Sequence, residues 1–226
     1  MALILGPVVW FVGFLLRYLA TETALTPAQQ AWAEQQDFAG PGQLIAYHAD
    51  PGLVTAAYAV FALGAVLMFP ACITLGQLIG TRLAYWGAML IVVGLFARLY
   101  FTGADQTAFQ LTETLGVGGA TQAVMAEYVD ISYGPWRVPV WCSVGQYAGT
   151  MLLVVAAWRT GLFGTARAVI VLLPGLTWMG VLKAATIPDL VTTALLAAVL
   201  LPLGLITLRH QPPPTIPPHP RRLLTW

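Results

Sequence analysis

Six apolar stretches, each long enough to cross a membrane, constrain the fold of this chain more than any other feature. A membrane-spanning helix needs about 20 mostly apolar residues. Backbone groups in lipid must be satisfied within their own segment, and the stretches lack the alternation of barrel strands, so each is predicted to be a helix. The sequence therefore predicts an all-α integral membrane protein, a six-transmembrane-helix bundle. The predicted spans are Leu3–Ala20, Gly52–Ile79, Leu83–Phe101, Val138–Trp158, Arg167–Ala185 and Leu190–Leu208.

The composition excludes a water-soluble fold. Only 8% of the residues are charged and 58% are hydrophobic, whereas a soluble domain has about 25% charged residues. We expect one transmembrane domain over residues 1–210, followed by a Pro-rich cytoplasmic tail over residues 211–226. The chain has no basic patch that would suit nucleic acid. Because the composition predicts a membrane protein, membrane lipid is the expected partner. The oligomeric state is left open.

The positive charges predict an orientation. Cytoplasmic loops collect Lys and Arg, and six arginines fall on one side of the predicted bundle. With six spans that side also holds both termini, so both are predicted to be cytoplasmic, in a plasma-membrane protein. The six are Arg82, Arg159, Arg167, Arg209, Arg221 and Arg222.

The acidic residues mark the opposite side. All nine Asp and Glu residues fall in segments that this topology places outside. Two of these segments, about residues 21–51 and 102–136, carry helical patterns and are too long for simple connections. We expect them to form two short helical extracytoplasmic cap segments.

Polar side chains inside the spans gather in their outer halves. A charge inside a span is costly, so such residues are functional candidates. We expect an outward-facing polar cavity that binds substrate through Arg98, Arg17, Tyr58, Gln146 and Tyr147. The alternative is that Arg98 pairs with Asp105 or Glu113 and only fixes the cap. Lys183 and Arg137 are interpreted as helix-end cations that reach the interface.

Two classes of function remain open. The first is a membrane-embedded enzyme that acts on an apolar, lipid-like or isoprenoid-like small molecule. It would use a carboxylate as acid or base, with Asp105, Glu113 and Asp130 as catalytic candidates. The second is a non-catalytic protein, such as a permease-like carrier, an immunity protein or an accessory subunit.

The sequence gives little sign of a metal or another cofactor. His48 and Asp50 are close together, but scattered ligands without tight spacing are a weak signal for zinc, and no dense acidic loop suits calcium. We therefore expect no metal site and no cofactor.

Overall fold

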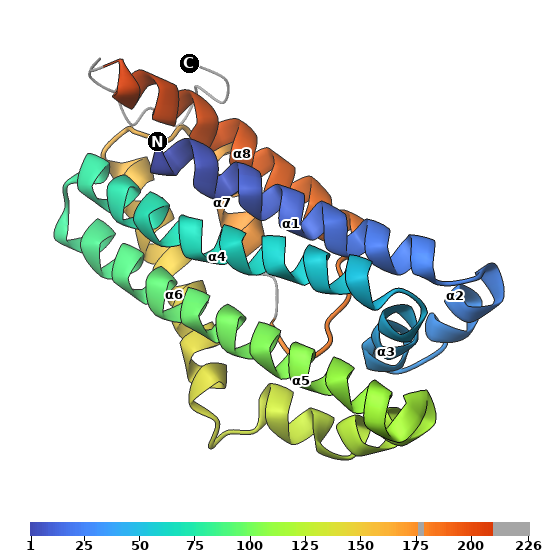
Figure 1. Cartoon of the computed structure of the whole chain (residues 1–226). Coiled ribbons are helices and arrows are strands. Elements are labelled where there is room, and N and C mark those ends of the chain that lie inside the picture. The colour runs from blue at the N-terminus through green and yellow to red at the C-terminus, as the bar shows by residue number, and fades with distance from the viewer. Residues whose placement is uncertain (176–178, 210–226) are drawn as a thin grey trace.

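The computed structural model describes residues 1–175 and 179–209, which are helical throughout most of their length and contain no strand (Figure 1). The helices are α1 (Ala2–Ala24), α2 (Pro27–Ala33), α3 (Gly40–Ala49), α4 (Pro51–Ile79), α5 (Arg82–Tyr133), α6 (Val138–Arg159), α7 (Thr165–Gly175) and α8 (Ile187–Leu208). The predicted tail, residues 211–226, lies outside the described residues.

Five of these helices are long and apolar enough to cross a membrane. They are α1, α4, α5, α6 and α8, and each contains an 18-residue window of high hydropathy with at most two charged residues. The bundle buries one side of each helix and leaves large apolar side chains exposed on the other, including Trp86, Met89 and Phe96. The chain is therefore a helical membrane protein, as its composition predicts.

The stretch predicted as the fifth span is not one continuous helix. It begins as α7, which is described as far as Gly175 and contains Pro174. Residues 176–178 lie outside the described part of the chain. Residues 179–186 are not helical, and the chain becomes helical again at Ile187, where Thr186 and Asp189 form a capping box. We refer to residues 179–186 as the non-helical segment.

Helix α5 is much longer than the span predicted within it. It passes Phe101 without a break and contains one non-helical residue, Gly116, whose φ of 68° and ψ of 168° suit only glycine. The chain reverses there, so that residues 117–133 run back beside residues 99–115 (Figure 1). The glycines at 118 and 119 are helical, so the reversal is confined to Gly116.

Glycines bring two pairs of helices into backbone contact. A Cβ atom added at Gly13 of α1 would lie 2.5 Å from the Cα atom of Phe61 in α4. In the α5–α6 pair, a Cβ atom added at Gly94 would lie 2.3 Å from the Cβ atom of Gln146. Small residues at helix contacts are typical of membrane bundles. The α1–α4 contact places Arg17 beside α4, and the α5–α6 contact places Arg98 beside α6.

The two segments predicted as caps lie at one end of the bundle. Helices α2 and α3 come from the first segment, and α3 packs against the part of α5 that forms the second (Figure 1). The N-terminus, the turn between α4 and α5 and the last turn of α8 lie at the other end (Figure 1). The arrangement therefore separates the acidic connections from the basic ones.

Candidate functional site

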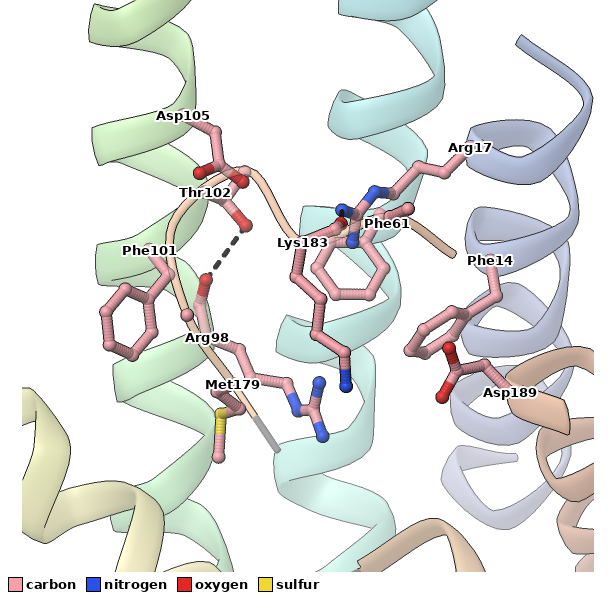
Figure 2. Close-up of a pocket in the computed structure, with 12 residues that line it drawn as sticks. Phe14, Arg17, Phe61, Arg98, Phe101, Thr102, Asp105, Met179, Lys183 and Asp189 are labelled. Carbon is pink, nitrogen blue, oxygen red and sulfur yellow. Dashed lines mark hydrogen bonds between the residues drawn. The ribbon is translucent and has the colours of Figure 1, made fainter. Parts of the chain in front are cut away.

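A small cavity of about 30 Å³ lies where α1, α4, α5, α8 and the non-helical segment meet (Figure 2). A space of this size can hold a water molecule or a small polar group. We call it the charged cavity, because its lining carries five charged side chains. These are Arg17, Arg98, Asp105, Lys183 and Asp189.

Arg17 projects from α1 and is only 7% exposed. Its Nη2 atom donates hydrogen bonds to the Tyr58 hydroxyl, at 3.0 Å, and to the carbonyl oxygen of Lys183. The guanidinium lies 4.2 Å from the ring centroid of Tyr58 and 4.5 Å from that of Phe61. Within the described residues its Nε atom has no hydrogen-bond partner, and no carboxylate lies within 4 Å of the side chain. Aromatic faces and backbone, rather than an acid, therefore hold this buried cation.

Arg98 projects from α5 and is also 7% exposed. Its Nε atom donates to the side-chain oxygen of Gln146 at 3.3 Å, and its guanidinium lies 5.1 Å from the Trp10 ring centroid. Thr102, one turn further along, donates to the Arg98 carbonyl (Figure 2). At about 1.5 Å per residue, Arg98 lies roughly 24 Å along α5 from the start of this helix at Arg82. Arg98 therefore lies towards the end of the bundle that holds the two segments predicted as caps.

Side chains hold the backbone of the non-helical segment at three successive residues. The Asp105 carboxylate accepts a hydrogen bond from the N–H of Leu182, and the Ser132 hydroxyl accepts one from the N–H of Val181 at 3.3 Å. Arg17 donates to the carbonyl of Lys183. Asp105 is 3% exposed and Ser132 is fully buried. Residues from α1 and from both arms of α5 therefore replace the hydrogen bonds that a helix would have supplied.

Leu182 carries backbone strain within this segment. Its φ of 50° is positive, which is uncommon for a residue other than glycine. The Leu182 side chain is fully buried, and its N–H is bound to Asp105. A strained conformation of this kind persists where the surrounding structure determines it and is frequent at functional sites.

An apolar cavity of about 70 Å³ adjoins the charged one. Arg98 belongs to the lining of both cavities. From Arg98 and Gln146 the apolar cavity extends among side chains of α4, α5, α6 and α8. These include Met68, Leu75, Leu95, Leu153 and Leu196. The two cavities together offer a polar and an apolar compartment that meet at one arginine.

The three carboxylates predicted as catalytic candidates lie in different places. Asp105 lines the charged cavity. Glu113 accepts a hydrogen bond from the Tyr47 hydroxyl at 2.9 Å, in the contact between α3 and α5; burial and the Glu113 carboxylate raise the pKa of Tyr47. Asp130 forms an ion pair with Arg137 in which both side chains are about half exposed. Only the first of the three is therefore close to the arginines.

The predicted binding residues are partly brought together. Arg17 and Arg98 line the charged cavity, and Gln146 lines the apolar one. Tyr58 contacts Arg17 but does not line the charged cavity. The Tyr58 hydroxyl accepts a hydrogen bond from Arg17 and donates one to the side-chain oxygen of Gln43 at 3.3 Å. Tyr147 is half-buried and lines neither cavity.

Two charged residues of the site escape the sequence reasoning. Lys183 is interpreted there as a helix-end cation and Asp189 is counted among the outer acids, yet both line the charged cavity. The signal that could have found them is the pair Pro174 and Gly175, which disfavour a continuous helix, inside an apolar stretch. Such breaks occur at membrane depth where the irregular backbone lines a cavity.

The described residues contain no group of three or more His, Cys, Asp and Glu side chains that could hold a metal ion. Asp50, which the sequence places near His48, caps α4 by accepting the N–H of Leu53 at 2.9 Å. Comparison with known protein families, curated proteins and solved structures finds no match to this chain. Functional inference therefore depends on the geometry of the two cavities.

Proposed function

We propose that this protein is a multi-pass membrane protein that binds a small lipid-like molecule, with the polar end in the charged cavity and the apolar end in the apolar cavity. The observation that carries the proposal is the position of Arg98, which lines both. Ligand sites in proteins combine apolar walls with a few placed polar groups. An amphipathic molecule would match both compartments at once.

The discontinuous passage through α7 and the non-helical segment supports a binding role. In many carriers the substrate site is formed by helices that break near the middle of the membrane. Here the break is lined by Arg17, Asp105 and Lys183, which contact or belong to the non-helical segment. A non-catalytic, carrier-like protein is therefore the function that we favour.

The proposed topology has six crossings, with α7 and the non-helical segment together forming the fifth. Both termini would be cytoplasmic in a plasma membrane, because Arg82, Arg159, Arg167 and Arg209 gather at their end of the bundle. The charged cavity would then face outwards, beneath the two cap segments.

A second candidate is a membrane-embedded enzyme, and the position of Asp105 favours it. This carboxylate is buried beside the cavity, and it would be placed to exchange a proton with a bound substrate. Glu113 and Asp130 stay as candidates from sequence only. If the protein is an enzyme that uses Asp105, the wild-type protein should carry the product, and the inactive Asp105→Asn variant should carry the unreacted substrate.

Native mass spectrometry of protein purified in a mild non-ionic detergent tests the proposal. We expect a discrete bound mass in wild type that is lost in Arg98→Gln and retained in Arg137→Gln, a variant whose changed residue is exposed and outside both cavities. Equal retention in both variants, with both folded, would contradict the proposed site. A bound mass that differs between wild type and Asp105→Asn would favour the enzyme.

A further inference from the structure

We infer that the head group bound in the charged cavity carries a single negative charge, and that the ligand is a single-chain amphiphile of the fatty-acid type. This inference rests on the proposed function, since it specifies the ligand of the same site. It follows from four features of the cavity: its charge, its free donor, its aromatic faces and its volume.

The first feature is the charge of the lining. Three cations, Arg17, Arg98 and Lys183, face two carboxylates, Asp105 and Asp189, which leaves one positive charge in excess. An unbalanced charge is unfavourable in a site that lies away from water. One anionic group would balance the five side chains, whereas a cationic group would add to the excess.

The second feature is that the acids are already engaged while one donor is not. The Asp105 carboxylate accepts the N–H of Leu182, and the Asp189 carboxylate accepts both the N–H and the hydroxyl of Thr186, at 3.0 and 2.7 Å. The buried Nε atom of Arg17 has no partner among the described residues. Buried polar atoms normally have hydrogen-bond partners. Among the described buried side-chain atoms of the site, one donor and no acceptor is without a partner, and a carboxylate would add acceptors rather than donors.

The third feature is that the aromatic faces already hold cations. Arg17 lies over Tyr58 and Phe61, and Arg98 lies over Trp10. Aromatic faces are the usual means of binding a quaternary ammonium group. Arg17 and Arg98 occupy these aromatic faces, so a cationic head group could not bind to the faces and would be repelled by the two guanidinium groups.

The fourth feature is volume. The charged cavity, at about 30 Å³, suits a group as small as a carboxylate. The planar fork of an arginine matches a carboxylate with two parallel hydrogen bonds. The apolar cavity, at about 70 Å³, has room for a few methylene groups of one chain and no room for two chains. A short-chain free fatty acid combines these properties.

The experiment compares three ligands with the same short chain, matched to the volume of the apolar cavity: pentanoic acid, pentanol and pentylamine. Each is titrated at pH 8.5 into protein in nanodiscs of uncharged lipid, and binding is followed by thermal shift and by tryptophan fluorescence. We expect the acid to bind at least tenfold more tightly than the alcohol or the amine. Equal or tighter binding of the alcohol or the amine would overturn the anionic head group while leaving ligand binding intact. Binding of none of the three would overturn this inference and, with an empty native mass spectrum, the proposed function as well.

Variants separate the charge argument from a loss of folding. Arg17→Gln is expected to weaken binding of the acid at least tenfold and to leave the alcohol within twofold, while Arg17→Lys restores part of the affinity. Asp105→Asn keeps the acceptor for Leu182 but removes a negative charge, so it is expected to tighten binding of the acid severalfold. A gain of affinity cannot come from misfolding. Weaker binding of the acid by a folded Asp105→Asn protein would contradict the inference, and Arg137→Gln serves as the unchanged control.

Discussion

The α5–α6 pair and the passage from α7 to α8 fill the same depth of the bundle in different ways. In the pair, each helix satisfies its own backbone, and glycines let the two backbones touch, as at Gly94 beside Gln146. In the passage, the described part of α7 reaches Gly175, and Asp105, Ser132 and Arg17 supply hydrogen bonds to the non-helical segment. The difference shows that buried polar side chains replace the hydrogen bonds of a helix where the backbone is not helical.

The comparison also separates stability from function. At Gly94 the α5–α6 contact leaves no space for a side chain, whereas both cavities border the broken passage, because Gly180 and Lys183 line one and Pro174 and Gly175 line the other. A substitution at Gly94 should therefore act mainly on folding, and those around the passage should act on local order and ligand. The following predictions test this division, from the largest expected effect to the smallest.

The largest effect is expected for Gly94→Ala. The new Cβ atom would lie 2.3 Å from the Cβ atom of Gln146, so the helices must separate. Overpacking of this kind costs about 3 kcal/mol. Thermal unfolding in detergent measures the loss. Gly103→Ala, also on α5, is the matched control, because nothing lies within 4 Å of its added Cβ atom. Equal stability of Gly94→Ala and Gly103→Ala would mean that the α5–α6 contact is not tight.

Asp105→Ala is expected to cost about 2 kcal/mol, because it leaves the buried N–H of Leu182 without an acceptor. The loss should be local: hydrogen exchange is expected to increase over residues 179–186 and to stay unchanged in α6. Asp105→Asn retains an acceptor oxygen and should restore most of the protection. If Asp105→Asn exchanged as fast as Asp105→Ala, the negative charge rather than the hydrogen bond would hold the segment.

Ser132→Ala is expected to have a smaller effect, about 1 kcal/mol. The hydrogen bond from the Val181 N–H to the Ser132 hydroxyl is long, at 3.3 Å. Ser132 is fully buried, and replacing it with alanine removes only the hydroxyl oxygen, so the cavity that is created is small. Ser132→Thr, which keeps a hydroxyl but adds a methyl group, controls for packing. Hydrogen exchange at the Val181 amide tests the role of Ser132. If Ser132→Ala changed exchange only within residues 117–133 of α5, Ser132 would not hold the non-helical segment.

The smallest effect is expected for Arg137→Gln. The ion pair with Asp130 is exposed at both side chains, and pairs of this kind contribute little to stability. We expect an unchanged melting temperature and an unchanged bound mass in native mass spectrometry. Loss of the bound molecule from folded Arg137→Gln protein would instead return Asp130 to the functional site.

Hydropathy predicts most of the fold because a helix in lipid must satisfy its own backbone. The predicted spans at residues 3–20, 52–79, 83–101, 138–158 and 190–208 all lie within helices of the structure. The same rule fails at residues 167–185, where side chains from α1 and α5 supply the missing partners. No local pattern reveals such partners, because they come from distant parts of the chain.

The site is predicted only where charge interrupts an apolar run. Arg17 and Arg98 stand out for that reason, and both line the charged cavity. Lys183 and Asp189 lie at the ends of predicted spans, where charges are ordinary, so the only sequence signal for them is indirect: the pair Pro174 and Gly175 inside the apolar stretch. Asp105, Glu113 and Asp130 all fall in the same predicted cap segment, and the sequence alone does not tell which of these acids faces inward.

The central claim is that side chains from α1 and α5 hold residues 179–186 in place although these residues are not helical. Hydrogen exchange over residues 179–186, compared with exchange in α6, tests this claim most directly. For wild type we predict protection of the amides of Val181 and Leu182 approaching that of α6, although the segment is not helical. Added pentanoic acid should increase that protection, and Asp105→Ala should abolish it while α6 stays protected. Rapid exchange of these amides in wild type, with or without the acid, would contradict both the structure of the passage and the site built on it.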